Sequence, residues 1–185
     1  MMVNLPQTYL LGLCFLLVII SILVGRQLYK VRKDEMKLLK LEKEDSNTQE
    51  DSAKMYELAS VQLKKRLYPQ ATSTLKQALK KLDGEPEEAK ALIENALGFA
   101  LAAQNDFKSA VIHYKKALTA KADYPVALNN LGFAYQRLLK EDEAYKNYQE
   151  VLKLDPNNKT AISQIKRLER IVGKDKDQLL NKKGF

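Results

Sequence analysis

The chain has 185 residues, of which 45% are hydrophobic, with only 7 glycines and 5 prolines, a composition typical of a mostly helical protein. One cysteine excludes a disulfide framework and a cysteine-based zinc site, and one histidine leaves little for acid–base or nucleophilic catalysis. We therefore expect a protein that is not an enzyme and has no metal, cofactor or small-molecule substrate. The net charge of +8 makes nucleic acid and anionic lipid candidate partners.

Residues 1–25 predict a transmembrane anchor. No charged side chain precedes Arg26, and residues 9–25 contain twelve Leu, Ile, Val or Phe residues. Each favours insertion by roughly 0.3–0.6 kcal/mol near the bilayer centre. The run spans about 25 Å, and a snorkelling Arg26 can extend it towards the bilayer thickness. A cleaved signal peptide is the main alternative, but the sequence lacks its basic start and its small-residue cleavage site.

The basic residues after this segment predict its orientation. The positive-inside rule places the N-terminus outside and everything after residue 25 on the cytoplasmic or stromal face. These side chains can also contact anionic headgroups, so the positive charge is less indicative of nucleic acid as a partner. The membrane-proximal basic residues are Arg26, Lys30, Arg32, Lys33, Lys37 and Lys40. We expect residues 26–51 to form a basic, partly helical linker.

A 34-residue period follows the linker. Leu97-Gly98-Phe99-Ala100 matches Leu131-Gly132-Phe133-Ala134, and a third copy begins near residue 52. This period is the tetratricopeptide signature, so we predict an all-α solenoid; a plain helical bundle would not share the spacing. The expected segments are repeat 1 at 52–90 with an inserted loop, repeat 2 at 91–124, repeat 3 at 125–158, a capping helix at 159–173 and a flexible tail at 174–185.

Small residues at equivalent positions predict where the two helices of each repeat cross, because they let two backbones approach closely. The repeat-packing residues are Ala59, Ala71, Gly98, Ala110, Gly132, Ala144 and, as the helix stop of repeat 3, Pro156. The turn position that is usually Gly in this class is Arg66, Asn105 and Leu139. Asn105 tolerates a left-handed turn, whereas Leu139 suggests a slightly different one.

The tetratricopeptide resemblance implies a concave, protein-binding groove lined by the first helix of each repeat. Carried over by position, the proposed groove residues are Tyr56, Ser60, Lys64, Asn95, Phe99, Asn129, Phe133, Gln136 and Arg137, with Leu92, Val126 and several smaller side chains beside them. We interpret the two Asn side chains as ligands for an extended backbone. Packing between repeats is an equally good interpretation of the two Phe side chains. A carboxylate clamp for chaperone C-termini is not expected, because Tyr56 and Ser60 replace its basic and amide residues. His113 is interpreted as an ordinary structural or surface residue.

The anchor, basic linker, three repeats with LNNLGFAY and LKLDPNN, and the short basic tail together resemble the photosystem I assembly proteins of cyanobacteria and plastids in the tetratricopeptide class. The resemblance implies a thylakoid location and a chaperone-like scaffold that holds photosystem I subunits or other assembly factors. Two alternatives stay open: a bacterial inner-membrane tetratricopeptide adaptor, and a basic lipid- or RNA-binding protein.

Overall fold

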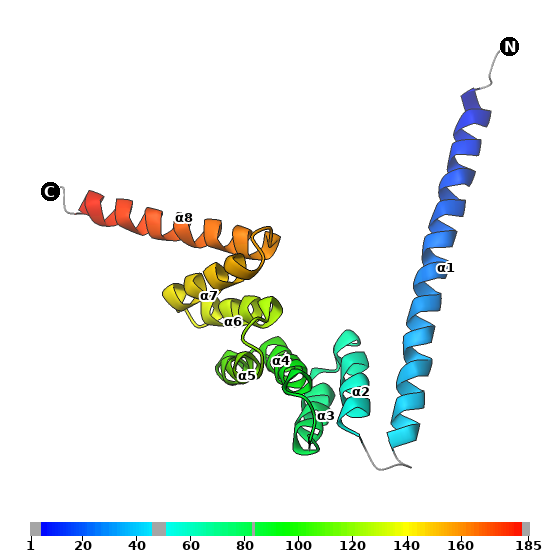
Figure 1. Ribbon diagram of the computed structural model, residues 1–185. Helices are drawn as coiled ribbons and strands as arrows, with labels where there is room; N and C mark the ends of the chain where they lie inside the picture. The colour runs from blue at the N-terminus through cyan, green and yellow to red at the C-terminus, as the bar shows by residue number, and fades with distance from the viewer. Residues whose placement is uncertain (1–4, 46–50, 83, 183–185) are drawn as a thin grey trace. The chain divides into compact units, whose positions relative to one another are not determined.

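The computed structural model describes residues 5–45, 51–82 and 84–182 (Figure 1). These residues form eight helices: α1 Leu5–Asp45, α2 Ser52–Lys64, α3 Tyr68–Lys80, α4 Glu87–Ala103, α5 Phe107–Ala120, α6 Pro125–Arg137, α7 Glu141–Leu154 and α8 Lys159–Lys182. The chain divides into two units, Met1–Thr48 and Gln49–Phe185. The expected class, an all-α solenoid with an apolar N-terminal helix, is confirmed.

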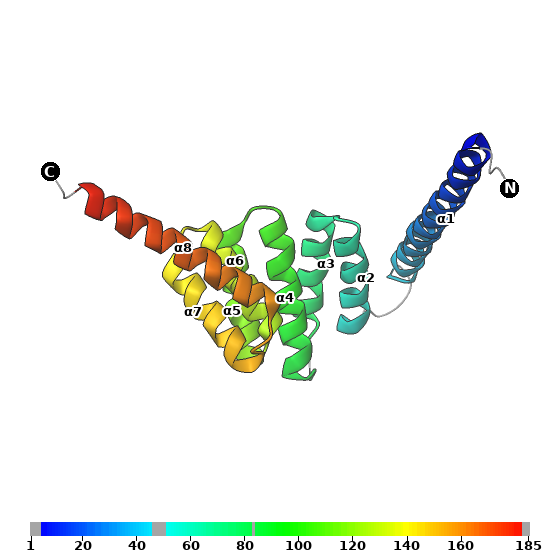
Figure 2. The ribbon, with the colours of Figure 1, turned by 90° about the horizontal axis from the view of Figure 1, so that it is seen from above.

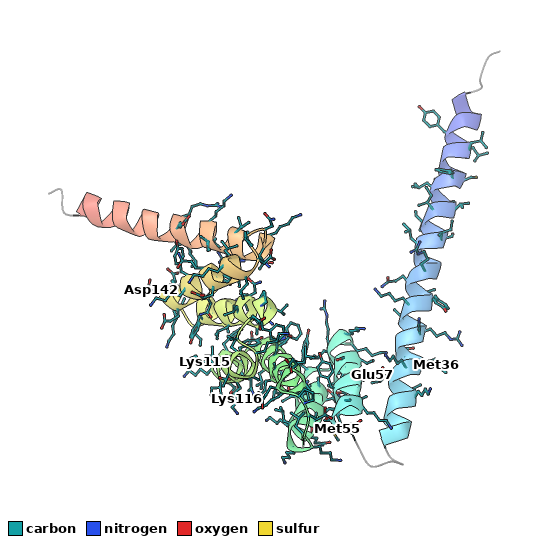
Figure 3. All side chains as sticks on the ribbon, viewed as in Figure 1. Met36, Met55, Glu57, Lys115, Lys116 and Asp142 are labelled. Atoms are coloured by element: carbon teal, nitrogen blue, oxygen red, sulfur yellow. The ribbon has the colours of Figure 1, made fainter. Side chains whose placement is uncertain are left out.

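The first unit is the single helix α1. Its part from Tyr9 to Lys40 includes a stretch long and apolar enough to cross a membrane. The apolar side chains there are exposed, and side chains project from α1 all around its axis (Figure 3). Such an exposed apolar surface is stable in lipid rather than in water. The proposed linker begins inside this helix, and its end at residues 46–50 lies outside the described residues.

The second unit is a stack of three helical hairpins and a cap. Each helix from α2 to α8 packs on the next one, as Figure 2 shows. The first helices of successive hairpins also contact each other, α2 with α4 and α4 with α6. One continuous apolar core runs through the stack from Met55 in α2 to Leu168 in α8. The first helices therefore lie side by side and share one surface of the solenoid.

Glycine lets the hairpins of repeats 2 and 3 close tightly. A Cβ built on Gly98 would lie 2.7 Å from Cδ1 and Cε1 of Tyr114, and one on Gly132 would lie 2.8 Å from Cζ of Tyr148. Both rings are almost fully buried. In repeat 1 the equivalent helix crossing pairs Ala59, which is larger than the Gly of the other repeats, with Leu75, which is smaller than their Tyr. The volumes on the two helices therefore compensate from repeat to repeat.

The helix termini follow from local side chains. The carboxylates of Asp51 and Asp106 accept hydrogen bonds from the amides of Ala53 and Ser109, so they cap α2 and α5. The hydrogen bonds to Ser109 hold the pKa of Asp106 below its usual value. Pro125 is the first residue of α6, where its missing N–H costs nothing. Pro156, the predicted stop of repeat 3, is exposed and lies two residues after the end of α7.

The three hairpin turns share one backbone conformation. Arg66, Asn105 and Leu139 all have left-handed φ angles, of 61°, 64° and 58°. The expectation that Leu139 would produce a different turn is therefore wrong. Packing of α6 on α7 fixes the turn, and Leu139 adopts the conformation despite a cost of about 1–2 kcal/mol for an L-residue with a Cβ.

The last helix is longer than the expected cap. Helix α8 continues beyond residue 173 to Lys182, because residues 159–182 contain no proline and a single glycine costs a helix only about 1 kcal/mol. Ala161 and Leu168 on α8 are buried against the stack. The side chains of the expected flexible tail at 174–185 lie outside the described residues, and so does the backbone of residues 183–185. The inserted loop after repeat 1 includes residue 83, which also lies outside the described residues.

Candidate protein-binding groove

The predicted groove residues lie on one face of α2, α4 and α6. Their spacing of three or four residues keeps them on the same side of each helix. Lys64, Phe99, Phe133 and Arg137 are exposed; Tyr56, Ser60, Asn95, Asn129 and Gln136 are half-buried. Because these helices contact one another in order, the nine side chains belong to one surface, which we call the first-helix surface. Leu92 and Val126 add exposed apolar area to it.

The two asparagines make equivalent contacts within the solenoid. Nδ2 of Asn95 donates to the hydroxyl of Tyr124 at 3.3 Å, and Nδ2 of Asn129 donates to Oδ1 of Asn158 at 3.3 Å. In each case the acceptor residue directly precedes the next helix of the stack, α6 or α8. Oδ1 of Asn95 also accepts from Nδ2 of Asn130 at 3.0 Å. These amides therefore connect one hairpin to the next.

Two further polar side chains of this surface have contacts inside the repeats. The Ser60 hydroxyl donates to the Tyr56 carbonyl at 2.8 Å, and Oε1 of Gln136 accepts from the Tyr148 hydroxyl at 3.0 Å. Oδ1 of Asn129 differs, since it is buried and has no hydrogen-bond partner within the described part of the chain. Most of the predicted polar ligands are thus already engaged in the fold.

The two phenylalanines pack and remain accessible at once. Phe99 lies edge-on to Tyr68 with ring centroids 6.5 Å apart, and Phe133 lies edge-on to Phe107 at 6.3 Å. Each pair joins a first helix to the second helix of the preceding hairpin. Even so, Phe99 is 44% exposed and Phe133 is 48% exposed. The guanidinium of Arg137 lies 5.0 Å from the centroid of the Phe107 ring, which holds its charge beside this apolar surface.

A shallow pocket of about 190 Å³ lies between the N-terminal ends of α2 and α4. The Ser52 hydroxyl donates to Oε1 of Glu85 at 3.0 Å at its polar end. Tyr56 and Leu92 contribute aromatic and apolar walls. The full lining is Ser52, Ala53, Tyr56, Glu85, Ala89, Leu92 and Ile93. Its size and lining suit one apolar side chain rather than a small-molecule substrate.

Burial changes the acidity of three tyrosines near this surface. Desolvation raises the pKa of Tyr124, and the hydrogen bond from Asn95 opposes part of that shift. Burial also raises the pKa of Tyr114 and of Tyr148 well above 10. All three hydroxyls are therefore neutral hydrogen-bonding groups at physiological pH. Among the described residues no cluster of three His, Cys, Asp or Glu side chains could hold a metal ion.

The sequence interpretation missed a buried pair in repeat 2. Nδ1 of His113 on α5 lies 2.6 Å from Oε2 of Glu94 on α4, and Glu94 is only 4% exposed. The equivalent positions are Met55 with Thr74 in repeat 1 and Leu128 with Asn147 in repeat 3. The signal was present in the alignment of the repeats, because Glu94 is an acidic residue at a position that is apolar in both other copies.

Comparison with family models and relatives agrees with this architecture. The tetratricopeptide repeat model matches residues 125–158, and the TPR repeat model matches residues 98–138. The chain is 32% identical over 156 residues to the protein ycf37 of Cyanophora paradoxa, covering 84% of this chain and 90% of that relative. It is 29% identical over 164 residues to ycf37 of Guillardia theta, covering 89% and 92%.

A third relative is longer. The chloroplastic tetratricopeptide repeat domain-containing protein PYG7 of Arabidopsis thaliana is 30% identical over 158 residues, covering 85% of this chain but 52% of the relative. Among solved structures, the second TPR domain of human RPAP3 in complex with the HSP70 peptide SGPTIEEVD superposes with a TM-score of 0.57 at 23% identity, covering 62% of this chain and 92% of that domain. A chain of the APC/C hetero-tetramer Cut9–Hcn1 gives 0.69 at 20% identity, covering 78% and 28%. These two likenesses show the fold.

Proposed function

Since the chain belongs to the ycf37 family, the tetratricopeptide class of photosystem I assembly proteins that its sequence resembles, we propose that it is a non-enzymatic, membrane-tethered scaffold that assists assembly or stability of photosystem I. The observation that carries the proposal is the first-helix surface, where exposed aromatic side chains recur on successive helices of a solenoid that follows an apolar, membrane-length helix. The chloroplastic location of the relative PYG7 supports this over a bacterial inner-membrane adaptor.

Tethering gives the scaffold its physical advantage. A client already inserted in the same membrane meets the groove at a raised effective concentration, without any additional contact. We place the helix in the thylakoid membrane with the N-terminus outside and the repeats on the stromal or cytoplasmic face. The basic residues after the span and their absence before it support that orientation.

The client chemistry follows from what the first-helix surface leaves accessible. Phe99 and Phe133 offer apolar contact, and Arg137 offers a positive charge beside them. A segment with apolar side chains next to an acidic one fits these groups. The RPAP3 domain binds an HSP70 peptide that ends in EEVD. In this chain Tyr56 and Ser60 occupy the first-repeat groove positions, so we do not propose a chaperone C-terminus as the client.

Co-purification from solubilised membranes tests the groove. The variant Phe99→Ala/Phe133→Ala/Arg137→Ala removes the accessible groups, and we expect it to lose at least about tenfold in recovered photosystem I subunits, as expected for truncated aromatic and Arg anchors. The control Ile112→Ala/Leu154→Ala removes exposed apolar side chains from the second helices α5 and α7. Equal recovery of photosystem I subunits by both variants would refute the groove. Circular dichroism should show both variants to be folded.

A further inference from the structure

Basic side chains form a stripe along one face of α1 beyond the proposed membrane span. They recur at alternating spacings of four and three residues, the spacing that keeps side chains on one face of a helix. At about 100° per residue, all five fall within about 80° of the helix circumference. Arg32 lies about 120° away from their centre. The basic stripe consists of Arg26, Lys30, Lys33, Lys37 and Lys40, all of them exposed.

Membrane topology does not require this one-sided arrangement. The positive-inside rule depends on how many Lys and Arg residues flank the span, not on the face they occupy. A helix lying on the bilayer surface would need an apolar face opposite its basic one. Here the exposed Glu35 lies about 180° from the centre of the stripe, where that face would enter the lipid. The arrangement therefore indicates a partner that approaches from one side.

The length of the helix carries the distal part of the stripe beyond the bilayer. Helix α1 is unbroken from Leu5 to Asp45, so the stripe continues along the same axis as the span. Residue 40 lies about 21 Å along this axis from residue 26. Exposed charges interact over only about 8 Å at physiological ionic strength. Residue 33 lies about 10 Å along the axis from residue 26, within reach of the headgroup layer, whereas Lys37 and Lys40 lie beyond the reach of the headgroups of the membrane that the helix spans.

We propose that the basic stripe is a docking surface for an acidic protein flank that rises from the same membrane beside α1. About one basic group per helical turn, all on one side, is complementary to carboxylates arranged along the membrane normal. The partner is thus an integral membrane protein with an acidic extension on the side of the repeats. This inference rests on the proposed function, which supplies the spanning helix and a membrane-inserted client.

Two adjacent residues provide a matched test. Lys33→Glu reverses a charge on the stripe, whereas Arg32→Glu makes the same change off the stripe, at nearly the same distance from the membrane. The full chain would be reconstituted in nanodiscs of neutral lipid, and its affinity for purified photosystem I would be measured. We expect Lys33→Glu to weaken binding about fivefold and Arg32→Glu less than about twofold. High salt should remove the difference.

Three results would overturn the proposal, and they differ in what else they affect. Equal weakening by both variants, with intact wild-type binding, refutes the stripe and leaves the scaffold function standing. A difference that appears only in discs containing anionic phosphatidylglycerol assigns the stripe to lipid headgroups instead. No binding by the wild-type chain refutes the proposed function and the docking role together. A difference in neutral discs that salt abolishes supports the acidic partner.

Discussion

Adding one methyl group at the helix crossing of repeat 2 tests how the repeats pack. In Gly98→Ala the new Cβ would lie 2.7 Å from two ring carbons of Tyr114, closer than real Cβ contacts allow. The ring is only 2% exposed, so it has little room to move. Overpacking of this kind costs about 1–3 kcal/mol, and the better helix propensity of Ala recovers up to about 1 kcal/mol. We expect a net loss of about 1–2 kcal/mol in unfolding free energy.

The second half of the test uses the solution present in repeat 1. The double variant Gly98→Ala/Tyr114→Leu recreates the pair Ala59 and Leu75, so the two changes should compensate by about 1 kcal/mol or more in a double-mutant cycle. Unfolding of the full chain in detergent would be followed by near-ultraviolet circular dichroism of its tyrosines. Gly25→Ala is the matched control, because its added Cβ meets nothing within 4 Å. Additive single effects, with no coupling, would refute the volume compensation.

Three further predictions concern strain, burial and pH. Leu139→Gly removes an 86% exposed side chain at a φ of 58° and should raise stability by up to about 1 kcal/mol, measured as thermal midpoint; a lower midpoint would contradict the strain. His113→Asn leaves the buried carboxylate of Glu94 without its imidazole partner and should lower the free energy of unfolding by about 3 kcal/mol. The double variant Glu94→Leu/His113→Asn, which recreates the repeat 3 pair, should restore the wild-type free energy of unfolding or exceed it, as measured by urea unfolding. Burial raises the folded-state pKa of Tyr114 and Tyr148, so the stability that each residue contributes is complete below the unfolded pKa of about 10. This stability is lost as pH rises through the folded-state pKa values, and the free energy of unfolding falls by roughly 1.4 kcal/mol per pH unit for each tyrosine. Replacing either tyrosine by Phe should reduce this slope in alkaline unfolding, and an unchanged slope would argue against it.

The sequence was sufficient for the architecture because the 34-residue period and the apolar run are properties of whole segments. Leu97 and Leu131, or Gly98 and Gly132, report the same packing twice, so an error at one position is corrected by the other. The same comparison aligns Leu139 with Asn105 and so indicated a left-handed turn, but the expectation at Leu139 followed the preference of the single residue instead. Its left-handed conformation is imposed by the packing of two helices and overrides the preference of the single residue.

The candidate groove was less predictable than the fold. Position in the repeat placed Asn95 and Asn129 on the first-helix surface, but it did not reveal that their amides donate to Tyr124 and Asn158 of the next segment. Those contacts depend on side-chain geometry across 29 residues, which periodicity does not encode. The role of Phe99 as both a packing and an accessible side chain likewise needed the structure, because exposure is a property of its neighbours.

Charge and apolar recognition are separated along the chain, which has a measurable consequence for the two proposals. The basic stripe contains five cationic side chains, whereas the predicted groove residues include only Lys64 and Arg137 beside the accessible phenylalanines. Long-range attraction to an acidic client would therefore act mainly through α1, and the residence time of the complex through the repeats. Raising the salt concentration should slow association of the wild-type chain with photosystem I and leave dissociation almost unchanged. The Phe99→Ala/Phe133→Ala variant should show the opposite pattern, with faster dissociation and nearly unchanged association. A variant that changes both rates equally would show that the stripe and the groove do not act separately.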